Sequence, residues 1–503
     1  MKGSSLLACV MLLAMPLPGA EWTDNFTFEP VPMPEGVDPQ VGAMGALPDG
    51  RLAVAFHRGE LMILDPATGK WSLFASGLQE PLGMLVESPS SILVMQRAEL
   101  TRIRDVNGDG RADRFDTIFD GFGMTGNYHE FAYGPAKAKD GSLYVALGLA
   151  SNMAPMSLEI RGEFSTIGRL DRAQMSNPRE WNRNKDRAGR MYGRVAYRGW
   201  VMRGSPDGSK WEPFASGFRS PNGIAFDAAG RLLVTDNQGD WRPTSPLYSV
   251  GKGKFYGHPA SLVWTPGWKK GDPDLFDAKE LESMGEAPAG FFPHGELANS
   301  PTEPAILPKG AVPDAIAGQT VIGEMNQNTL VRVLDDEVKG VHQVALVPFF
   351  DGSPLGIGNN RLAFGKDGSM YVGKSALAWA GSNGIMRVRW RGEPFFAIER
   401  IKAQRGGFAV RFTEGIDRST LSSLRVKCHT YRATSNYGGP KLDESNLIPG
   451  DLKLAGDGRT ITFNVGDLKE HYLYEINASA VKSSDGDQLL GKKAWYFAGK
   501  SPD

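Results

Sequence analysis

The stretch DVNGDGRADRFD, residues 105–116, has the residue types and spacing of a calcium-binding loop. Ca²⁺ takes about six to eight oxygen ligands, which a tightly curved loop can supply. Gly110 occupies the sharp-turn position, and the predicted ligands are Asp105, Asn107, Asp109, Arg111 through its carbonyl, Asp113 and Asp116. Asp116 stands where a longer Glu is usual. We predict a calcium ion that braces the fold, and the alternative is a surface turn that needs no metal.

A second group of polar residues emerges from an internal repeat. Residues 76–96 align with residues 216–236 without a gap. In this alignment Gln79 corresponds to Arg219 and Leu82 to Asn222. Two equivalent backbone positions normally hold similar residues, so the change from Leu to Asn suggests that Arg219 and Asn222 line a cavity. The same unit ends in the polar cluster Asp236, Asn237, Gln238, Asp240 and Trp241. The structural alternative is that Asp and Asn cap turns and pair with the arginine.

His129 in GNYHEFAYGP lies at the start of a predicted strand. An imidazole that faces a cavity there is suited to act as a general base. The alternative is a buried histidine that only hydrogen-bonds, and His258 and His294 are weaker candidates. The sequence contains no HExxH zinc motif, no GxSxG elbow and no glycine-rich strand-to-helix turn, so it offers no support for those metal, serine-hydrolase or nucleotide sites.

The elements that must position these residues are β-hairpins. Turn-and-strand units related to the repeat recur at residues 47–56, 138–147 and 365–374, and more weakly at 317–333. Six such units close a ring of four-stranded blades and leave no open sheet edge. We therefore predict an all-β protein, a six-bladed β-propeller followed by a small Ig-like β-sandwich. The blades are long on average, and we expect two excursions, residues 171–197 and 265–304, to cover a rim of the ring.

The domain boundaries follow from shifts in composition. Residues 1–20 have Lys2 before an apolar stretch and predict a cleaved signal peptide, so we expect a periplasmic or secreted protein. We assign residues 21–393 to the propeller and 394–503, with short alternating runs, to the sandwich. The formal net charge of −1 predicts no nucleic-acid partner. No membrane insertion is expected, because no segment matches the length of a membrane span. Cleavage would leave Cys428 as the single cysteine, which excludes an internal disulfide.

Several motifs together resemble the glucose/sorbosone dehydrogenase superfamily of six-bladed propellers. They are YHEFAYGPAKAKDGSLYVALG, ASGFRSPNGIAFDAAGRLLVTDNQGDW, KFYGHP and NNRLAFGKDGSMYVG, and the resemblance covers roughly residues 40–390. The chain is also similar to exported propeller proteins of planctomycetes and verrucomicrobia, but it lacks the haem module that many of them carry.

The resemblance implies a dehydrogenase that uses pyrroloquinoline quinone (PQQ). It places His129 as the base that removes a hydroxyl proton while hydride passes to the quinone. It places Arg219 as a clamp on the cofactor and Lys374 as a further cofactor ligand, with Asn222, Asp236, Asn237 and Gln238 nearby. Ser220 replaces an Asn of the family pattern.

We therefore predict an exported protein that oxidises a sugar or related alcohol and passes electrons to an external acceptor. One alternative is a non-catalytic carbohydrate-binding or scaffold propeller. The other is a polysaccharide lyase or hydrolase, which requires paired carboxylates or a His-Tyr pair in the channel.

Overall fold

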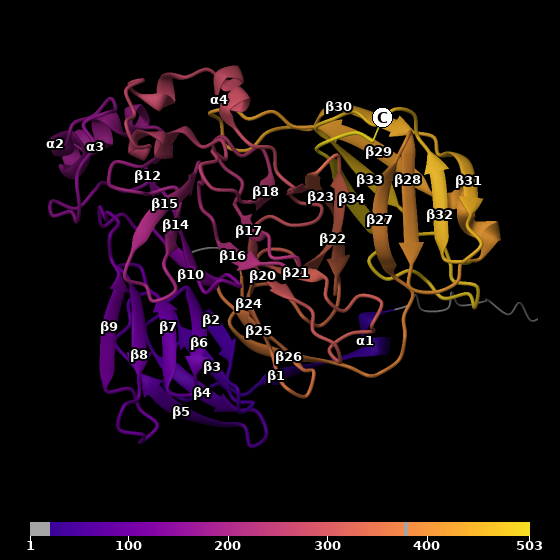
Figure 1. The fold of residues 1–503 in the computed structure, drawn as a ribbon, viewed down its shortest axis with the longest axis horizontal. Coiled ribbons are helices and arrows are strands. Elements are labelled where there is room, and N and C mark those ends of the chain that lie inside the picture. The colour runs from indigo at the N-terminus through magenta and orange to yellow at the C-terminus, as the bar shows by residue number, and fades with distance from the viewer. Residues whose placement is uncertain (1–20, 377–380, 503) are drawn as a thin grey trace, which may run out of the picture.

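The computed structural model describes residues 21–376 and 381–502, and strands are its main regular structure (Figure 1). This confirms the all-β class. The predicted signal peptide, residues 1–20, lies outside the described residues. Within the described ranges, no helix combines the length and the apolar character needed to span a bilayer.

Antiparallel sheets of consecutive strands succeed one another along the chain. The first sheet contains β2 (Val41–Ala46), β3 (Leu52–Phe56), β4 (Leu61–Asp65) and β5 (Lys70–Ala75). The second contains β6 (Gly83–Ser88), β7 (Ser91–Met95), β8 (Leu100–Arg104) and β9 (Arg114–Phe119). The third contains β10 (Ala132–Lys137), β11 (Leu143–Leu147), β14 (Trp200–Gly204) and β15 (Trp211–Ser216).

The next three sheets repeat this pattern. The fourth contains β16 (Gly223–Phe226), β17 (Leu232–Thr235), β18 (Ser245–Ser249) and β19 (Gly290–Phe292). The fifth begins with β20 (Pro301–Ile306), β21 (Thr320–Glu324), β22 (Leu330–Val338) and β23 (Val341–Phe349). The last contains β24 (Asn359–Phe364), β25 (Met370–Lys374), β26 (Gly384–Trp390) and, from the start of the chain, β1 (Phe26–Val31).

The first strands of these sheets form a closed circuit. Each contacts the first strand of the next sheet, and β24 returns to contact β2. The circuit is tied by β1, which pairs with β26 from Phe26↔Trp390 to Val31↔Ile385. Each first strand is hydrogen-bonded on one side only, and the closed circuit covers its other edge with the first strands of the neighbouring sheets. The arrangement is consistent with a β-propeller.

Two excursions from the sheets carry the helices. Between β11 and β14 lie β12 (Ala150–Ser151), α2 (Arg172–Ser176), α3 (Pro178–Asn184), the 3₁₀ turn η1 (Lys185–Ala188) and β13 (Met191–Tyr192). Between β18 and β19 lie η2 (Pro259–Trp264), η3 (Pro273–Leu275) and α4 (Ala278–Met284). Figure 1 shows both groups at the same end of the ring, as the sequence predicted for excursions that cover a rim. A short helix, α1 (Trp22–Asn25), precedes β1.

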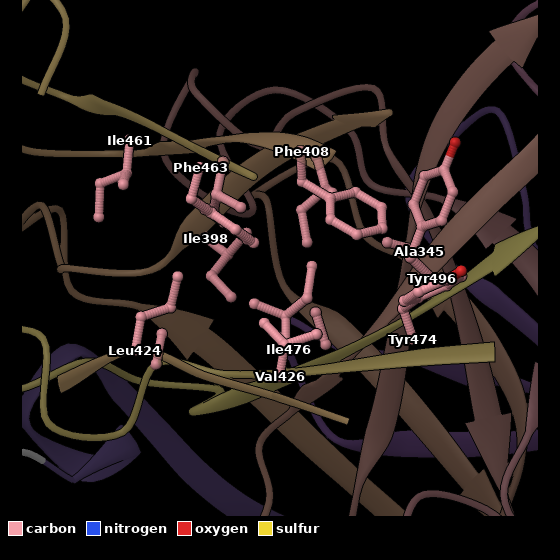
Figure 2. Packing of buried hydrophobic residues seen from close by; sticks show 14 of the residues in the cluster. Ala345, Ile398, Phe408, Leu424, Val426, Ile461, Phe463, Tyr474, Ile476 and Tyr496 are labelled. Atoms are coloured by element: carbon pink, nitrogen blue, oxygen red, sulfur yellow. The ribbon is translucent and has the colours of Figure 1, made fainter. Parts of the chain in front are cut away.

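The C-terminal part consists of two facing sheets. One contains β27 (Ile398–Gln404), β28 (Gly407–Phe412), β32 (Thr460–Asn464) and β31 (Gly450–Leu454). The other contains β34 (Lys493–Ala498), β33 (Tyr472–Asn477), β29 (Arg425–Thr430) and β30 (Leu442–Leu447). A 3₁₀ turn, η4 (Arg418–Ser423), lies between β28 and β29. Side chains of both sheets interdigitate in an apolar core (Figure 2).

This C-terminal core extends into the ring. Strand β34 pairs with β23 through Ala345↔Tyr496 and Leu346↔Trp495, so the fifth ring sheet continues into the C-terminal sheet. Ala345 and Val347 of β23 are buried in the same apolar cluster as Phe408 and Ile476. The two parts of the chain therefore share both hydrogen bonds and buried apolar surface.

The glycine in each copy of the sequence repeat explains how tightly the ring closes. A Cβ atom on Gly83 would lie 1.9 Å from the carbonyl oxygen of Gly134, and one on Gly223 would lie 2.2 Å from that of Thr302. Both obstacles are backbone atoms of the neighbouring sheet, which no side-chain rotation can move. Neighbouring inner strands approach so closely that only glycine fits at these positions.

We predict that Gly223→Ala destabilises the protein by about 1–3 kcal/mol, because the methyl group forces the first strands of two sheets apart. Urea unfolding followed by tryptophan fluorescence measures the loss. Gly456→Ala is the matched control, since its Cβ atom would meet nothing within 4 Å and its φ is not in the left-handed region. Equal midpoints for the two variants would contradict this account of the ring.

Candidate functional site

A cavity of about 460 Å³ opens at the end of the ring where the excursions lie. It is lined by the loops that precede first strands and by the turns that follow second strands. Five residues singled out from the sequence line it: His129, Arg219, Asn222, Asn237 and Gln238. They come from the third and fourth sheets, and the closure of the ring brings them together.

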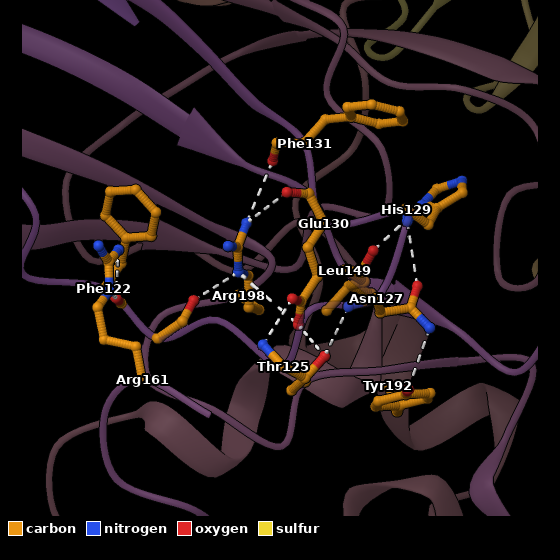
Figure 3. Close-up of polar contacts among 12 residues, drawn as sticks. Phe122, Thr125, Asn127, His129, Glu130, Phe131, Leu149, Arg161, Tyr192 and Arg198 are labelled. Atoms are coloured by element: carbon orange, nitrogen blue, oxygen red, sulfur yellow. Dashed lines mark hydrogen bonds and ion pairs between the residues drawn. The ribbon is translucent and has the colours of Figure 1, made fainter. Parts of the chain in front are cut away.

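His129 presents one ring nitrogen to this cavity. Its Nδ1 lies 3.1 Å from the carbonyl oxygen of Leu149. A carbonyl only accepts, so Nδ1 carries the hydrogen and donates it. The proton-free Nε2 then has its lone pair available, and in Figure 3 the end of the ring that bears it points away from the network. Burial, aided by the nearby charge of Arg219, lowers the pKa of His129 to about 4. The imidazole is therefore neutral near pH 7 and can accept a proton.

A buried network holds the backbone of His129 in place (Figure 3). Asn127 accepts a hydrogen bond from the N–H of His129, and its amide donates to the carbonyl of Ser151 and to the hydroxyl of Tyr192. Next in the chain, the Glu130 carboxylate accepts from the N–H and the hydroxyl of Thr125. None of these supporting residues was identified from the sequence, although Thr125 and Glu130 are only five residues apart.

Arg198 completes this network behind His129. Its Nε donates to the carbonyl of Gly123, and its Nη1 donates to the carbonyl of Glu130. Burial lowers the pKa of Arg198 to about 10, so the guanidinium stays charged at neutral pH. The loop before β10 is thus fixed by a buried charge that the closely placed Glu130 compensates.

Arg219 is held by a buried carboxylate. Its Nε donates to Oδ1 of Asp240 at 2.8 Å, and Nε2 of His258 donates to Oδ2 of Asp240 at 3.2 Å. The other nitrogen of His258 accepts from the N–H of Ala260, which assigns the hydrogen to Nε2. Burial alone would raise the pKa of Asp240, but His258 and Arg219 hold it well below its ordinary value. Asp240 stays ionised and orients the guanidinium of Arg219 at the cavity.

Asp236 is not among the cavity-lining residues, but it contacts the backbone of residues that are. It accepts hydrogen bonds from the N–H groups of Arg219 and Ser220 and from Nε of Arg242. The equivalent residue of the other repeat copy, Gln96, accepts from the N–H of Gln79 in the same way. The aligned repeat therefore reproduces one backbone-clamping contact at equivalent positions.

Lys374 lies apart from the cavity-lining residues. Its ammonium group donates to the carbonyls of Leu355 and Ile357 and to Oδ1 of Asn359. Burial lowers the pKa of Lys374 to about 8. In this structure the ammonium group closes the loop before β24, and its role as a cofactor ligand stays a prediction.

The predicted calcium loop joins β8 to β9 and is exposed. Asp105 accepts from the N–H groups of Gly108 and Gly110, and Asn107 accepts from that of Asp109. Asp113 closes the turn by accepting from the N–H groups of Val106 and Asn107. These bonds curve the loop, and they fit both the predicted calcium site and the alternative of a metal-free turn.

The twelfth position of the calcium loop behaves differently. Asp116 lies in β9, where its carboxylate pairs with Arg104 and Arg114. These two contacts lower the pKa of Asp116. The carboxylate is thus engaged with arginines, and it is the member of the predicted ligand set that fits a calcium ion least.

Two further cavity residues, Arg190 and Tyr437, carry no motif, and His294, a weaker candidate from the sequence, also lines the cavity. Arg190 lies at the end of the excursion that contains α2 and α3, and His294 lies between β19 and β20. Tyr437 comes from the connection between β29 and β30 in the C-terminal part. The guanidinium carbon of Arg190 lies 4.5 Å from the centre of the Tyr437 ring, and that of Arg219 lies 5.5 Å from it. No local signal in the sequence linked these segments.

The chain is similar to one protein family over part of its length and to several solved structures. A family model described as a domain of unknown function (DUF7133) matches residues 64–201. No curated protein matches the chain. Among solved structures, a putative oxidoreductase (glucose dehydrogenase) from Thermus thermophilus is 18% identical with a TM-score of 0.48, over 72% of this chain and 99% of that one.

Two other solved structures are similar to a comparable degree. The PQQ-bound aldose sugar dehydrogenase of Streptomyces coelicolor is 16% identical with a TM-score of 0.48, over 73% of this chain and 98% of that one. The holo form of the pyranose dehydrogenase PQQ domain of Coprinopsis cinerea is 14% identical with a TM-score of 0.47, over 72% and 95%. Likenesses this distant assign no activity to this chain, because activity depends on the site residues.

We predict that the His129 imidazole titrates with a midpoint near 4 and carries its hydrogen on Nδ1 when neutral. Long-range ¹H–¹⁵N NMR of ¹⁵N-histidine-labelled protein distinguishes the tautomers. Because the folded pKa lies below the ordinary 6.5, the unfolded chain binds the proton more readily. The contribution of this group to stability is therefore present above pH 6.5 and declines as the pH falls towards 4. A midpoint above 6 or the Nε2–H tautomer would contradict this geometry.

Proposed function

We propose that this chain is an exported oxidoreductase that removes hydride and a proton from a carbohydrate hydroxyl bound in the cavity. The observation that carries the proposal is the orientation of His129, whose Nδ1 is tied to Leu149 while Nε2 faces a cavity of about 460 Å³. A hydroxyl that donates to Nε2 transfers its proton to the imidazole as the adjacent carbon loses hydride. The imidazole needs no prior deprotonation, since its pKa is about 4.

In this proposal PQQ would be the hydride acceptor. When bound, it supplies a carbonyl system that takes up two electrons with the hydride. The cavity fits a planar polyanion in two respects, its volume and the absence of Asp or Glu among the described residues that line it. Arg219, Asn222, Asn237 and Gln238 are the residues that would hold it. Arg219 is the cation among these four residues, and Lys374 remains a predicted further ligand.

The remaining parts of the proposal concern architecture and location. We take the ring sheets as six blades ending near residue 393, with an Ig-like sandwich in residues 394–503. The signal peptide in residues 1–20 directs the chain to the periplasm or the exterior. Electrons leave to an external acceptor. A calcium ion binds Asp105, Asn107, Asp109, the carbonyl of Arg111 and Asp113.

A non-catalytic carbohydrate-binding propeller is the second candidate. It is favoured by the engagement of Arg219 with Asp240 and of Lys374 with backbone carbonyls, because both contacts reduce the charge available to a cofactor. A lyase or hydrolase that depends on paired carboxylates has less support, since no described lining residue is Asp or Glu.

We predict that His129→Ala lowers turnover by about 10²- to 10⁴-fold, because the variant lacks the proton acceptor. The assay uses purified protein reconstituted with PQQ and Ca²⁺, a panel of sugars and an artificial electron acceptor. His471→Ala is the control, since His471 is exposed in the C-terminal part. A wild-type protein that binds sugar but never reduces the acceptor would support the binding candidate. A His129→Ala variant with full turnover would remove His129 from the reaction.

We also predict that Ca²⁺ raises the unfolding midpoint. An ion at about 100 times its dissociation constant stabilises the native state by about 2.7 kcal/mol if the unfolded chain does not bind it. Thermal unfolding with Ca²⁺ and with a chelator measures the difference. Asp105→Ala and Asp109→Ala should abolish it, whereas Asp140→Ala, in an exposed turn of another sheet, should preserve it. Unchanged calcium responses in the first two variants would show that the loop is a metal-free turn.

A further inference from the structure

The connection between β29 and β30 reaches out of the C-terminal part to the cavity. We call residues 431–441 the arm, and Figure 1 shows it running from the sandwich towards α4. Three backbone hydrogen bonds fasten it to the turn after β17. Thr434 accepts from the N–H of Trp241 at 2.7 Å, Gly438 donates to the carbonyl of Gly239 at 2.9 Å, and Gly439 donates to that of Pro243 at 2.9 Å. The arm is therefore a fixed part of the cavity wall.

The arm places one aromatic ring at the cavity. Tyr437 lines the cavity and is 43% exposed. Its backbone forms a bridge to Asp240, the carboxylate that orients Arg219. An exposed aromatic face beside a polar cavity offers apolar surface to the C–H groups of a sugar ring.

The cavity wall near Tyr437 carries a positive charge that no described carboxylate neutralises. Among the described residues that line the cavity, Arg190 and Arg219 are the ones with a formal charge at neutral pH. Arg219 is compensated by Asp240 at 2.8 Å. In the described part of the chain, no carboxylate lies within ion-pair distance of the exposed Arg190, whose guanidinium carbon lies 4.5 Å from the centre of the Tyr437 ring.

The contact between Arg190 and Tyr437 leaves the N–H donors of the guanidinium available to a ligand. A guanidinium that lies over an aromatic face keeps its N–H donors in its own plane. Two of these donors match the two oxygens of a carboxylate, or two oxygens of a sulfate group. A neutral sugar would offer this cation no opposite charge.

We propose that the ligand of the cavity is a sugar with a negatively charged substituent, bound through that substituent by Arg190 and packed against Tyr437. The inference rests on the proposed function in that the same cavity binds a carbohydrate. It adds the substrate class and assigns a specificity-determining role to residues outside the predicted site, one in the excursion and one in the arm.

The test is calorimetric binding to the full processed chain without added quinone, at low ionic strength. Glucuronate and glucose 6-sulfate are compared with glucose, and the two anions distinguish a carboxylate from a sulfate ligand. We expect at least one anionic sugar to bind about 10-fold or more tightly than glucose. Arg190→Gln should abolish that preference. Arg183→Gln should retain it, since this matched control removes the same charge from an exposed position in the same excursion, where it pairs with Glu180. Tyr437→Ala should weaken all of the sugars alike.

The outcomes separate this inference from the proposed function. Equal affinity for anionic and neutral sugars, or a preference that survives Arg190→Gln, would overturn the inference even if glucose is oxidised. An anionic sugar that binds through Arg190 but reduces no acceptor after reconstitution with PQQ would support the inference and reject the dehydrogenase. Failure of all of the sugars to bind would overturn the inference, and the turnover assay with PQQ decides the dehydrogenase separately.

Discussion

The buried carboxylate of Asp240 is the interaction on which the arrangement of the site depends. A charge in the protein interior is costly unless it is paired and hydrogen-bonded. Asp240 meets this requirement with three partners from separate segments: Nε of Arg219, Nε2 of His258 and the N–H of Met191. One side chain thus joins the loop before β16, the excursion near η2 and the end of the excursion that carries Arg190.

The arrangement around Asp240 also depends on Gly239, which has no side chain. A Cβ atom on Gly239 would lie 1.9 Å from Nε of Arg219, so the guanidinium packs directly against the backbone of the turn after β17. The same turn accepts the arm through the carbonyl of Gly239. Close backbone approach therefore lets a cation, a carboxylate and a segment of the C-terminal part meet at one place.

Packing of the ring and construction of the site depend on different positions of the same strands. Apolar side chains in the strand interiors pack between neighbouring sheets, and the repeat glycines allow the inner strands to approach. Chemistry-bearing side chains lie just before first strands and just after second strands, in turns at one end of the ring. Asp236 and Gln96 show how a clamp at the strand end can be kept while the neighbouring positions change from Gln79 and Leu82 to Arg219 and Asn222.

The sequence by itself determined the features that depend on nearby residues. Hairpin periodicity and turn residues predicted the all-β class, and the ungapped repeat led to Arg219 and Asn222, because equivalent strands impose equivalent local constraints. Its Asp, Asn and Gly spacing also predicted the curved loop at residues 105–116.

Only the tertiary structure showed which side chains these residues contact. Lys374 and Asp116 are polar residues in suggestive positions, yet one closes a loop and the other pairs with arginines across its strand. Tyr437 and Arg190 carry no motif, and they meet because the C-terminal part continues the fifth ring sheet and sends the arm back to the cavity. Contacts between segments more than two hundred residues apart depend on how whole sheets pack. Local residue patterns do not predict that packing.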